Sequence, residues 1–173
     1  ILQTSQKLNC KIVAFLSGGK MLDYCIKNKI QHRIINKYHS PRASFTSYLY
    51  TMLKVLHTTL GIKKEDILES ISELEKINKI ICSLNLTDSN PSLSLAKWIT
   101  GIPMIYYPFG LQSASIRFKN SLQENSKMHV FSEDVMEACH NGIVAWEKKS
   151  NVQPILIQGQ DDFIKTKDIW NVL

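Results

Sequence analysis

The chain has 173 residues, of which 44% are hydrophobic, and a formal net charge of +6. This length suffices for one good core, and no apolar run approaches the about 20 residues that a membrane-spanning helix needs. The positive charge suits an anionic partner such as a phosphosugar or a nucleic acid, but the scattered lysines and arginines form neither a basic arm nor an interleaved basic and aromatic pattern. Neither nucleic acid nor a membrane is therefore expected as a partner.

The cysteines are widely spaced, without a CxxC pair or a neighbouring histidine set that would bind zinc: Cys10, Cys25, Cys82 and Cys139. Reduced thiols in a cytoplasmic protein account for them most simply. The chain has no initiator Met and opens inside a helical pattern, so we expect a fragment of a longer protein.

The first forty residues predict a strand–turn–helix unit, in the order helix 1–9, strand Lys11–Leu16, helix Met21–Lys27 and extended segment His32–Asn36. Between the strand and its helix, Gly18 and Gly19 make a turn that can present backbone N–H groups to an anion. It is not a P-loop, because the GxxxxGK[ST] spacing is missing. A tight turn that needs glycine for its backbone angles explains the pair equally well.

A long helix is predicted to begin at about Pro41 or Arg42, because proline disfavours helical geometry in Ser40 and suits a first turn. Its apolar residues recur at helical spacing up to Leu60 and Gly61 closes it, which predicts a core helix. Arg42 lies in the first turn, where a cation opposes the helix dipole, so it either faces an anion or is an ordinary surface arginine.

The rest of the chain predicts a parallel α/β layer fold, because helices alternate with short apolar strands. A second long amphipathic helix covers 63–86, and the polar connector 87–91 is the candidate boundary. The elements after it are helix 92–100, strand 104–107, helix 111–126, strand 128–131, helix 132–138 and strand 152–158. In such folds ligands gather at the carboxyl ends of the strands.

Two residues of this second part could exchange protons. Glu124 lies near the end of an amphipathic helix, where the dipole disfavours the ionised carboxylate, an arrangement that suits a general base more than stability. His140 lies in a polar loop before the apolar run Ile143–Trp146, where a histidine can exchange a proton near neutral pH. A solvated glutamate at a frayed helix end and an idle loop histidine are the alternatives.

Four segments, in the same order, are similar to the bifunctional phosphoglucose/phosphomannose isomerases of the sugar isomerase (SIS) superfamily. They are KIVAFLSGGK at Lys11–Lys20, SPRASFTSYLYTMLKVL at Ser40–Leu56, LQENSK around Glu124, and HN…IVAWE sixteen residues after it. Together they span about Lys11 to Gln160. The resemblance implies a SIS-type, flavodoxin-like fold and a fragment of a chain with two SIS domains. Residues 1–40 would end the first half, 41–86 form connecting helices, and 87–173 form an incomplete second half.

The resemblance further implies aldose–ketose isomerisation of glucose 6-phosphate or mannose 6-phosphate and fructose 6-phosphate through an enediol. Glu124 would be the base, His140 the acid/base that opens the ring, and Arg42 the cation near the developing oxyanion. Pro41 would shape the pocket, and Gly18 and Gly19 would bind substrate. No metal or organic cofactor is implied. The family's enzymes are dimers in which the histidine serves the neighbouring subunit, so His140 is expected to act in trans in a homodimer.

The chain departs from the family pattern at Cys139, where asparagine is usual, and at Gly142, where an acidic residue is usual, so a hydrogen bond that orients His140 could be missing. The family's Ser- and Thr-rich phosphate-binding loop and its C-terminal site lysine have no counterpart in the sequence, and we expect this chain alone to be inactive or impaired. A SIS-type sensor or regulator, which binds a phosphosugar without turning it over, is the alternative function. A purely structural fragment is a third.

Overall fold

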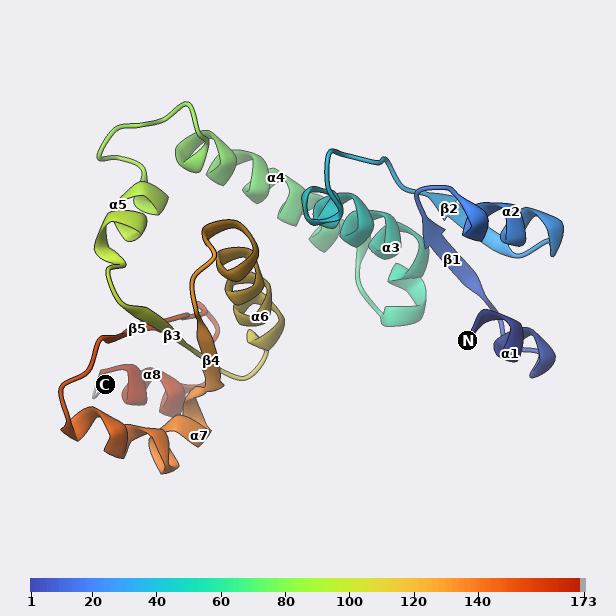
Figure 1. Ribbon diagram of the computed structural model, residues 1–173. Coiled ribbons are helices and arrows are strands. Elements are labelled where there is room, and N and C mark those ends of the chain that lie inside the picture. The colour runs from blue at the N-terminus through green and yellow to red at the C-terminus, as the bar shows by residue number, and fades with distance from the viewer. Residues whose placement is uncertain (172–173) are drawn as a thin grey trace. The chain divides into compact units, whose positions relative to one another are not determined.

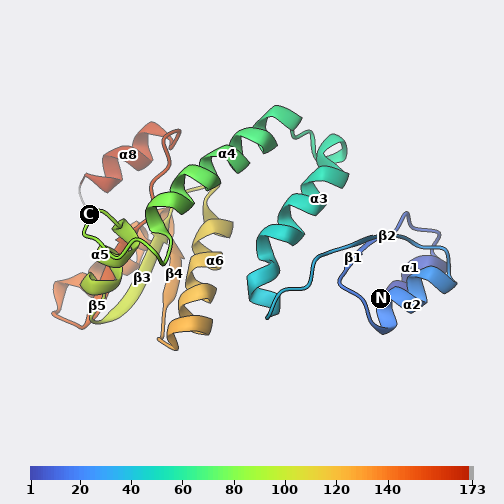
Figure 2. The same ribbon diagram turned by 90° about the horizontal axis from the view of Figure 1, so that it is seen from above.

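The computed structural model describes residues 1–171 and divides into two compact units, unit 1 (Ile1–Lys79) and unit 2 (Ile80–Leu173). The division falls inside one long helix. Each unit contains a parallel sheet with helices beside it (Figures 1 and 2). The predicted fold class, α/β with parallel-sheet layers and flanking helices, is confirmed. None of the helices in the described part of the chain combines the length and the apolar character needed to cross a membrane.

Unit 1 contains a two-stranded sheet and a helical hairpin. Its elements are α1 (Leu2–Lys7), β1 (Val13–Leu16), α2 (Lys20–Lys27), β2 (Gln31–Ile34), the 3-10 helix η1 (Pro41–Ser44), α3 (Phe45–Leu60) and α4 (Lys64–Ile81). Alternate residues of β1, Ala14 and Leu16, face the same side and pack with Cys25 of α2 and with Ile30 into a small core. Both strands run in the same direction, so their carboxyl ends, at Leu16 and Ile34, lie side by side.

The long helix starts close to the predicted residue, but the prediction that it is a core helix is wrong. Pro41 opens η1, which leads into α3, and Gly61 ends α3 in the left-handed conformation at φ 68°. However, no residue of α3 is buried. The helix pairs with α4, where Tyr50 Oη and Ser70 Oγ share a hydrogen bond of 3.2 Å. A pair of amphipathic helices covers only the seam between them, so the apolar residues of α3 stay half-exposed.

Unit 2 contains the larger sheet, of order β4-β3-β5, with all strands parallel. After α4 its elements are α5 (Pro91–Trp98), β3 (Ile102–Tyr107), α6 (Gln112–Ser121), the π-helical turn η2 (Leu122–Ser126), β4 (Phe131–Asp134), α7 (Val135–His140), the 3-10 helix η3 (Gly142–Glu147), β5 (Val152–Leu156) and α8 (Ile164–Trp170). Helix α8 has no counterpart among the predicted elements.

The central strand β3 presents one face to α6 and the other to α7 and α8. On one face, the buried Ser115 of α6 shares a hydrogen bond of 2.9 Å with Ser132 of β4. On the other, Tyr106 packs with Val135 and Ala138 of α7 and with Trp170 of α8. Unit 2 is therefore a three-layer arrangement with β3 at its centre, and the carboxyl ends of its strands share one edge.

Strand β4 and helix α7 lie later in the chain than predicted. The strand was expected at 128–131 and runs over Phe131–Asp134, because the π-helical turn and Lys127, at φ 57°, delay the return of the chain to the sheet. Asp134 then caps α7 by accepting a hydrogen bond from the Met136 N–H, so the helix starts at Val135 instead of Ser132.

Candidate functional site

Glu124 lies where the sequence predicts, at the end of the helix that follows β3. It is in the π-helical turn η2 and its side chain is exposed. The Lys127 ammonium donates a 2.6 Å hydrogen bond to the Glu124 carbonyl oxygen, and Asn125 Nδ2 donates to the Ser121 carbonyl oxygen. These contacts satisfy carbonyl groups that the end of a helix leaves without partners. The turn thus holds the Glu124 backbone in place and leaves its carboxylate at the surface.

His140 is the last residue of α7 and is exposed, so its predicted position in a loop is wrong. Helix α7 extends two residues beyond the predicted end at 138. Asn141 follows as the C-cap and donates a 2.8 Å hydrogen bond from Nδ2 to Glu137 Oε1. A short, capped helix therefore fixes the backbone of His140.

Glu124 and His140 belong to opposite faces of the unit 2 sheet. Glu124 follows α6, which packs on one face, whereas His140 ends α7, which packs on the other. In Figure 1, the C-terminal end of α6 and helix α7 lie at opposite ends of β4. The structure therefore does not bring this base and this acid/base together within one chain.

The other predicted site residues belong to unit 1. Arg42 is an exposed residue of η1, and Pro41 lines a small pocket at the carboxyl edge of β1 and β2. Gly18 and Gly19 form the turn after β1 with φ of 127° and 72°. A Cβ atom at either glycine would meet no atom within 4 Å, so glycine is required for backbone conformation and not for space. Both glycines thus serve the tight turn through their positive φ angles, and their part in substrate binding stays a prediction.

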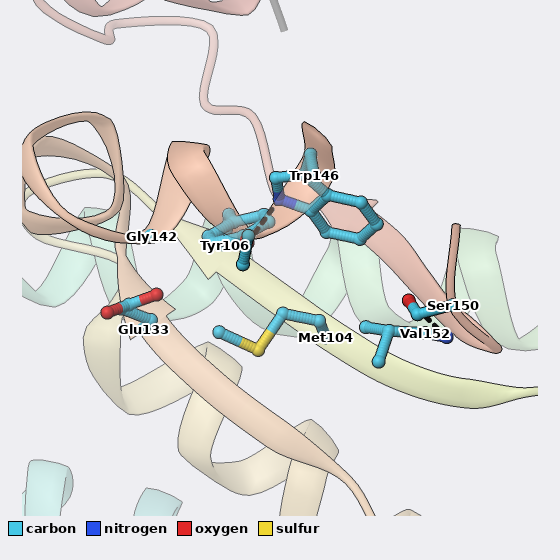
Figure 3. Close-up of a pocket in the computed structure, with 8 residues that line it drawn as sticks. Met104, Tyr106, Glu133, Gly142, Trp146, Ser150 and Val152 are labelled. Carbon is cyan, nitrogen blue, oxygen red and sulfur yellow. Dashed lines mark hydrogen bonds between the residues drawn. The ribbon is translucent and has the colours of Figure 1, made fainter. Parts of the chain in front are cut away.

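Unit 2 has a pocket that sequence analysis did not identify, between one face of the sheet and η3 (Figure 3). It has a volume of about 220 Å³. Its walls are mostly apolar, with Met104 and Val152 from the sheet and Trp146 from η3. Glu133 of β4 and Tyr106 of β3 add a carboxylate and a phenol. A negatively charged group would meet the Glu133 carboxylate here, so this pocket suits a neutral or cationic group better than a phosphate.

Trp146 and Tyr106 fix η3 to the sheet. Trp146 Nε1–H donates a 3.0 Å hydrogen bond to Tyr106 Oη, and the two rings meet edge to face with centroids 6.5 Å apart. Burial raises the pKa of the Tyr106 hydroxyl, and the negative groups at Glu133 and Cys139 raise it further, while the Trp146 hydrogen bond opposes the rise. Tyr106 is thus held as a neutral phenol at the back of the pocket.

Glu133 occupies the space beside Gly142, the position where the resembling family carries an acidic residue. A Cβ atom at Gly142 would lie 3.1 Å from Glu133 Oε2. A carboxylate from β4 therefore lies next to the segment that follows His140, although the sequence lacks one at position 142. No local pattern could reveal this, because the approach depends on which residue of β4 faces η3.

Comparison with known proteins finds one family and two curated relatives that are similar to this chain. Residues 88–173 match the family of the bacterial phospho-glucose isomerase C-terminal SIS domain. The chain is 28% identical over 160 residues to a D-glucosamine-6-phosphate 4-epimerase of Sulfolobus acidocaldarius, an alignment that covers 88% of this chain and 48% of the relative. It is 26% identical over 156 residues to a bifunctional phosphoglucose/phosphomannose isomerase of Caldicellulosiruptor bescii, covering 87% of this chain and 45% of the relative.

The chain thus spans about half the length of these curated relatives. No solved structure matches it.

Proposed function

The chain belongs, through residues 88–173, to the bacterial phosphoglucose isomerase C-terminal SIS family, and from this membership we propose that the protein is an aldose–ketose isomerase of hexose phosphates. The reaction would interconvert glucose 6-phosphate or mannose 6-phosphate with fructose 6-phosphate. The observation that carries the proposal is Glu124, which a defined turn holds at the surface within the matched domain. The relative from C. bescii, whose name states this pair of activities, supports it.

Isomerisation between C1 and C2 moves one proton between carbons and a second between oxygens. A base takes the proton from C2 of the aldose, a cis-enediol forms, and the proton returns to C1 to give the ketose. Glu124 would carry this proton, and its exposure leaves it accessible to a sugar. His140 would protonate the ring oxygen as the ring opens, and Arg42 would stabilise the negative oxygen of the enediolate.

A site that uses both Glu124 and His140 needs a second chain, because the sheet of unit 2 separates them within one. We therefore propose a homodimer in which His140 of one subunit serves the site that contains Glu124 of the other. The position of His140 at the end of a short surface helix supports this arrangement.

The test is turnover of fructose 6-phosphate by the complete gene product, with glucose 6-phosphate and mannose 6-phosphate measured separately. Glu124→Gln keeps the shape and removes the base, so kcat should fall by about 10² to 10⁴ while substrate affinity is kept. Glu147→Gln, an exposed glutamate at the end of η3, is the matched control and should keep full activity. Turnover that survives Glu124→Gln would reject Glu124 as the base.

Two other functions are separated by the same experiment, and one of them, epimerisation, has specific support. The relative from S. acidocaldarius favours epimerisation of a hexosamine phosphate, so glucosamine 6-phosphate is included as a substrate and inversion at C4 is followed. A phosphosugar sensor would bind fructose 6-phosphate without turnover, and Glu124→Gln would leave its affinity unchanged. Binding without turnover of either sugar by the complete, folded protein would favour the sensor.

A further inference from the structure

The unit 2 pocket, between one face of the sheet and η3, has the size of a site for a small molecule. Its volume of about 220 Å³ lies below the about 300–1,000 Å³ that is typical of pockets for drug-sized ligands. Residues of β3, β4, β5 and η3 line it, so segments that are far apart in the sequence meet here. A ligand in this pocket would be held between the sheet and η3.

The charge of the pocket comes from Glu133. Among the described residues that line the pocket, Glu133 alone is charged. It is half-buried, and no hydrogen bond or ion pair joins its carboxylate to another described residue. Gly142 leaves room for it, since a Cβ atom there would lie 3.1 Å from Glu133 Oε2. A carboxylate that is partly withdrawn from water and lacks a partner is costly, so this group calls for a cation.

The carboxylate lies at one end of the pocket, and apolar side chains lie toward the other. Glu133 pairs with Tyr106 and Val152 pairs with Ile102, so they lie beside residues of β3 that are four positions apart. At about 3.3 Å per residue, the two ends are roughly 13 Å apart along the strand. Met104 lies between them, as Figure 3 shows. The pocket thus fits a molecule that is charged at one end and apolar along its length.

Trp146 covers the pocket on the side of η3, and a hydrogen bond fixes its orientation. Its Nε1–H donates a 3.0 Å hydrogen bond to Tyr106 Oη, so the polar edge of the indole is already paired. The ring is left to contact an apolar body or to face a cation. The apolar part of a ligand would therefore replace water against Trp146, Met104 and Val152 without breaking this hydrogen bond.

We propose that the unit 2 pocket binds a small organic cation, a primary ammonium group on an apolar body, with the ammonium paired to Glu133. An alkylammonium remains protonated at neutral pH, as a lysine side chain does. A metal ion fits less well, because the described residues contain no group of three His, Cys, Asp or Glu that could hold one. This site is independent of the isomerase function, since neither Glu133 nor Trp146 takes part in the proposed reaction.

The experiment is calorimetric titration of the full chain with hexylamine at pH 7, with hexan-1-ol as the neutral molecule of the same shape. Hexylammonium should bind about five- to tenfold more tightly than hexan-1-ol, because its charged group pairs with a half-buried carboxylate. Glu133→Gln should remove this difference by weakening the binding of hexylammonium alone. Glu147→Gln, at an exposed glutamate outside the pocket, is the matched control and should bind both molecules as the wild type does.

A second probe tests the apolar end of the pocket. Hexane-1,6-diamine has the same length as hexylamine but carries an ammonium at each end, so one charge would meet the apolar lining near Val152. It should therefore bind at least about fivefold more weakly than hexylamine. A diamine that binds as tightly as hexylamine would overturn the proposal. So would equal hexylammonium affinity in the wild type and Glu133→Gln, or no binding of hexylammonium by the wild type.

Thermal unfolding without ligand separates a binding role of Glu133 from a structural one. Because its carboxylate has no partner among the described residues, Glu133→Gln should unfold at the same or a higher temperature than the wild type. It should also lose the rise in unfolding temperature that hexylammonium gives to the wild type. A lower unfolding temperature without ligand, with the hexylammonium shift intact, would show that the carboxylate serves the fold and would reject it as a binding group.

Discussion

The hydrogen bond between Trp146 and Tyr106 joins a segment of η3 to the central strand of unit 2, and its strength can be measured directly. Trp146 is 37% exposed and Tyr106 4% exposed, so water competes for the bond at one end only. Trp146→Phe and Tyr106→Phe each remove it, and a double-mutant cycle in urea unfolding should give a coupling free energy of about 0.5–1.5 kcal/mol. Additive effects of the two substitutions would mean that the bond contributes nothing to stability.

The raised pKa of Tyr106 predicts a loss of stability at high pH. The folded state holds the phenol proton more tightly than the unfolded state, whose pKa is close to the ordinary value of 10.0. Above about pH 10 the unfolded state therefore binds fewer protons than the folded state, and the free energy of unfolding falls as pH rises through the folded pKa. The fall between pH 8 and pH 11, followed by urea unfolding, should be smaller in Tyr106→Phe than in the wild type. Identical pH profiles would contradict a raised pKa of Tyr106 in the folded state.

The neighbouring sequence predicts the position of some site residues but not the contacts that others make. The place of Glu124 at a helix end follows from apolar spacing up to Leu122, and the structure agrees. The approach of Glu133 to Gly142 does not, because it depends on the pairing of β4 with β3, which puts Glu133 opposite Tyr106. Likewise, nothing in the segment 37–40 indicates that the Ser40 hydroxyl becomes buried without a hydrogen-bond partner among the described residues. Contacts between separate helices and strands cannot be predicted from a short stretch of sequence, because they depend on how the strands pair.

The entry to β3 depends on a close approach that only glycine permits. A Cβ atom at Gly101 would collide with the backbone carbonyl of Asn151, which accepts a 2.8 Å hydrogen bond from the Ile102 N–H at the start of the β3–β5 pairing. Gly101→Ala should therefore lower the free energy of unfolding by more than about 2 kcal/mol. Gly110→Ala is the control, since its Cβ atom meets no atom within 4 Å and only the φ of 90° is strained, at a cost of about 1–2 kcal/mol.

Equal destabilisation by the two substitutions, measured by urea unfolding, would show that backbone conformation and not crowding makes Gly101 necessary. A smaller effect of Gly101→Ala than of Gly110→Ala would mean that the Asn151 carbonyl moves aside at little cost.

The positions of helices and strands were predicted well where the sequence has a clear capping residue or a regular spacing of apolar residues. Asn90 accepts hydrogen bonds from the Ser92 and Leu93 N–H groups and starts α5 with Pro91 as its first residue, close to the expected 92. Strand β4 was misplaced by three residues because it is an edge strand of polar sequence, FSED, whereas the more apolar residues before it do not pair. Hydrophobic pattern locates strands at the centre of a sheet more reliably than strands at its edge.

The molecule as a whole contains two compact units, and the residues proposed for one reaction are divided between them. Arg42 belongs to unit 1, while Glu124 and His140 belong to opposite faces of the sheet in unit 2. The resemblance in sequence gave the order of these residues along the chain, but their distribution over faces and units became visible only in three dimensions. Within one chain, Glu124 and His140 therefore do not form a complete site by themselves.

Sharing of sites between subunits makes a quantitative prediction about mixed dimers of the complete gene product. Glu124→Gln and His140→Asn should each be nearly inactive when pure. If His140 acts in the partner's site, a mixed dimer has one site with both Glu124 and His140 intact and one site with neither. Random exchange of equal amounts makes half of the dimers mixed, so the activity should recover to about a quarter of the wild-type value.

The measurement is fructose 6-phosphate turnover before and after the two variants are unfolded together and refolded, with each variant refolded alone as the control. The same recovery cannot arise if both residues act within one chain, because every site would then lack one of them. A mixture no more active than its separate components, although mixed dimers form, would show that His140 serves its own subunit. The chain would then have to bring His140 to the face of the sheet that α6 covers, which the capped and packed helix α7 opposes.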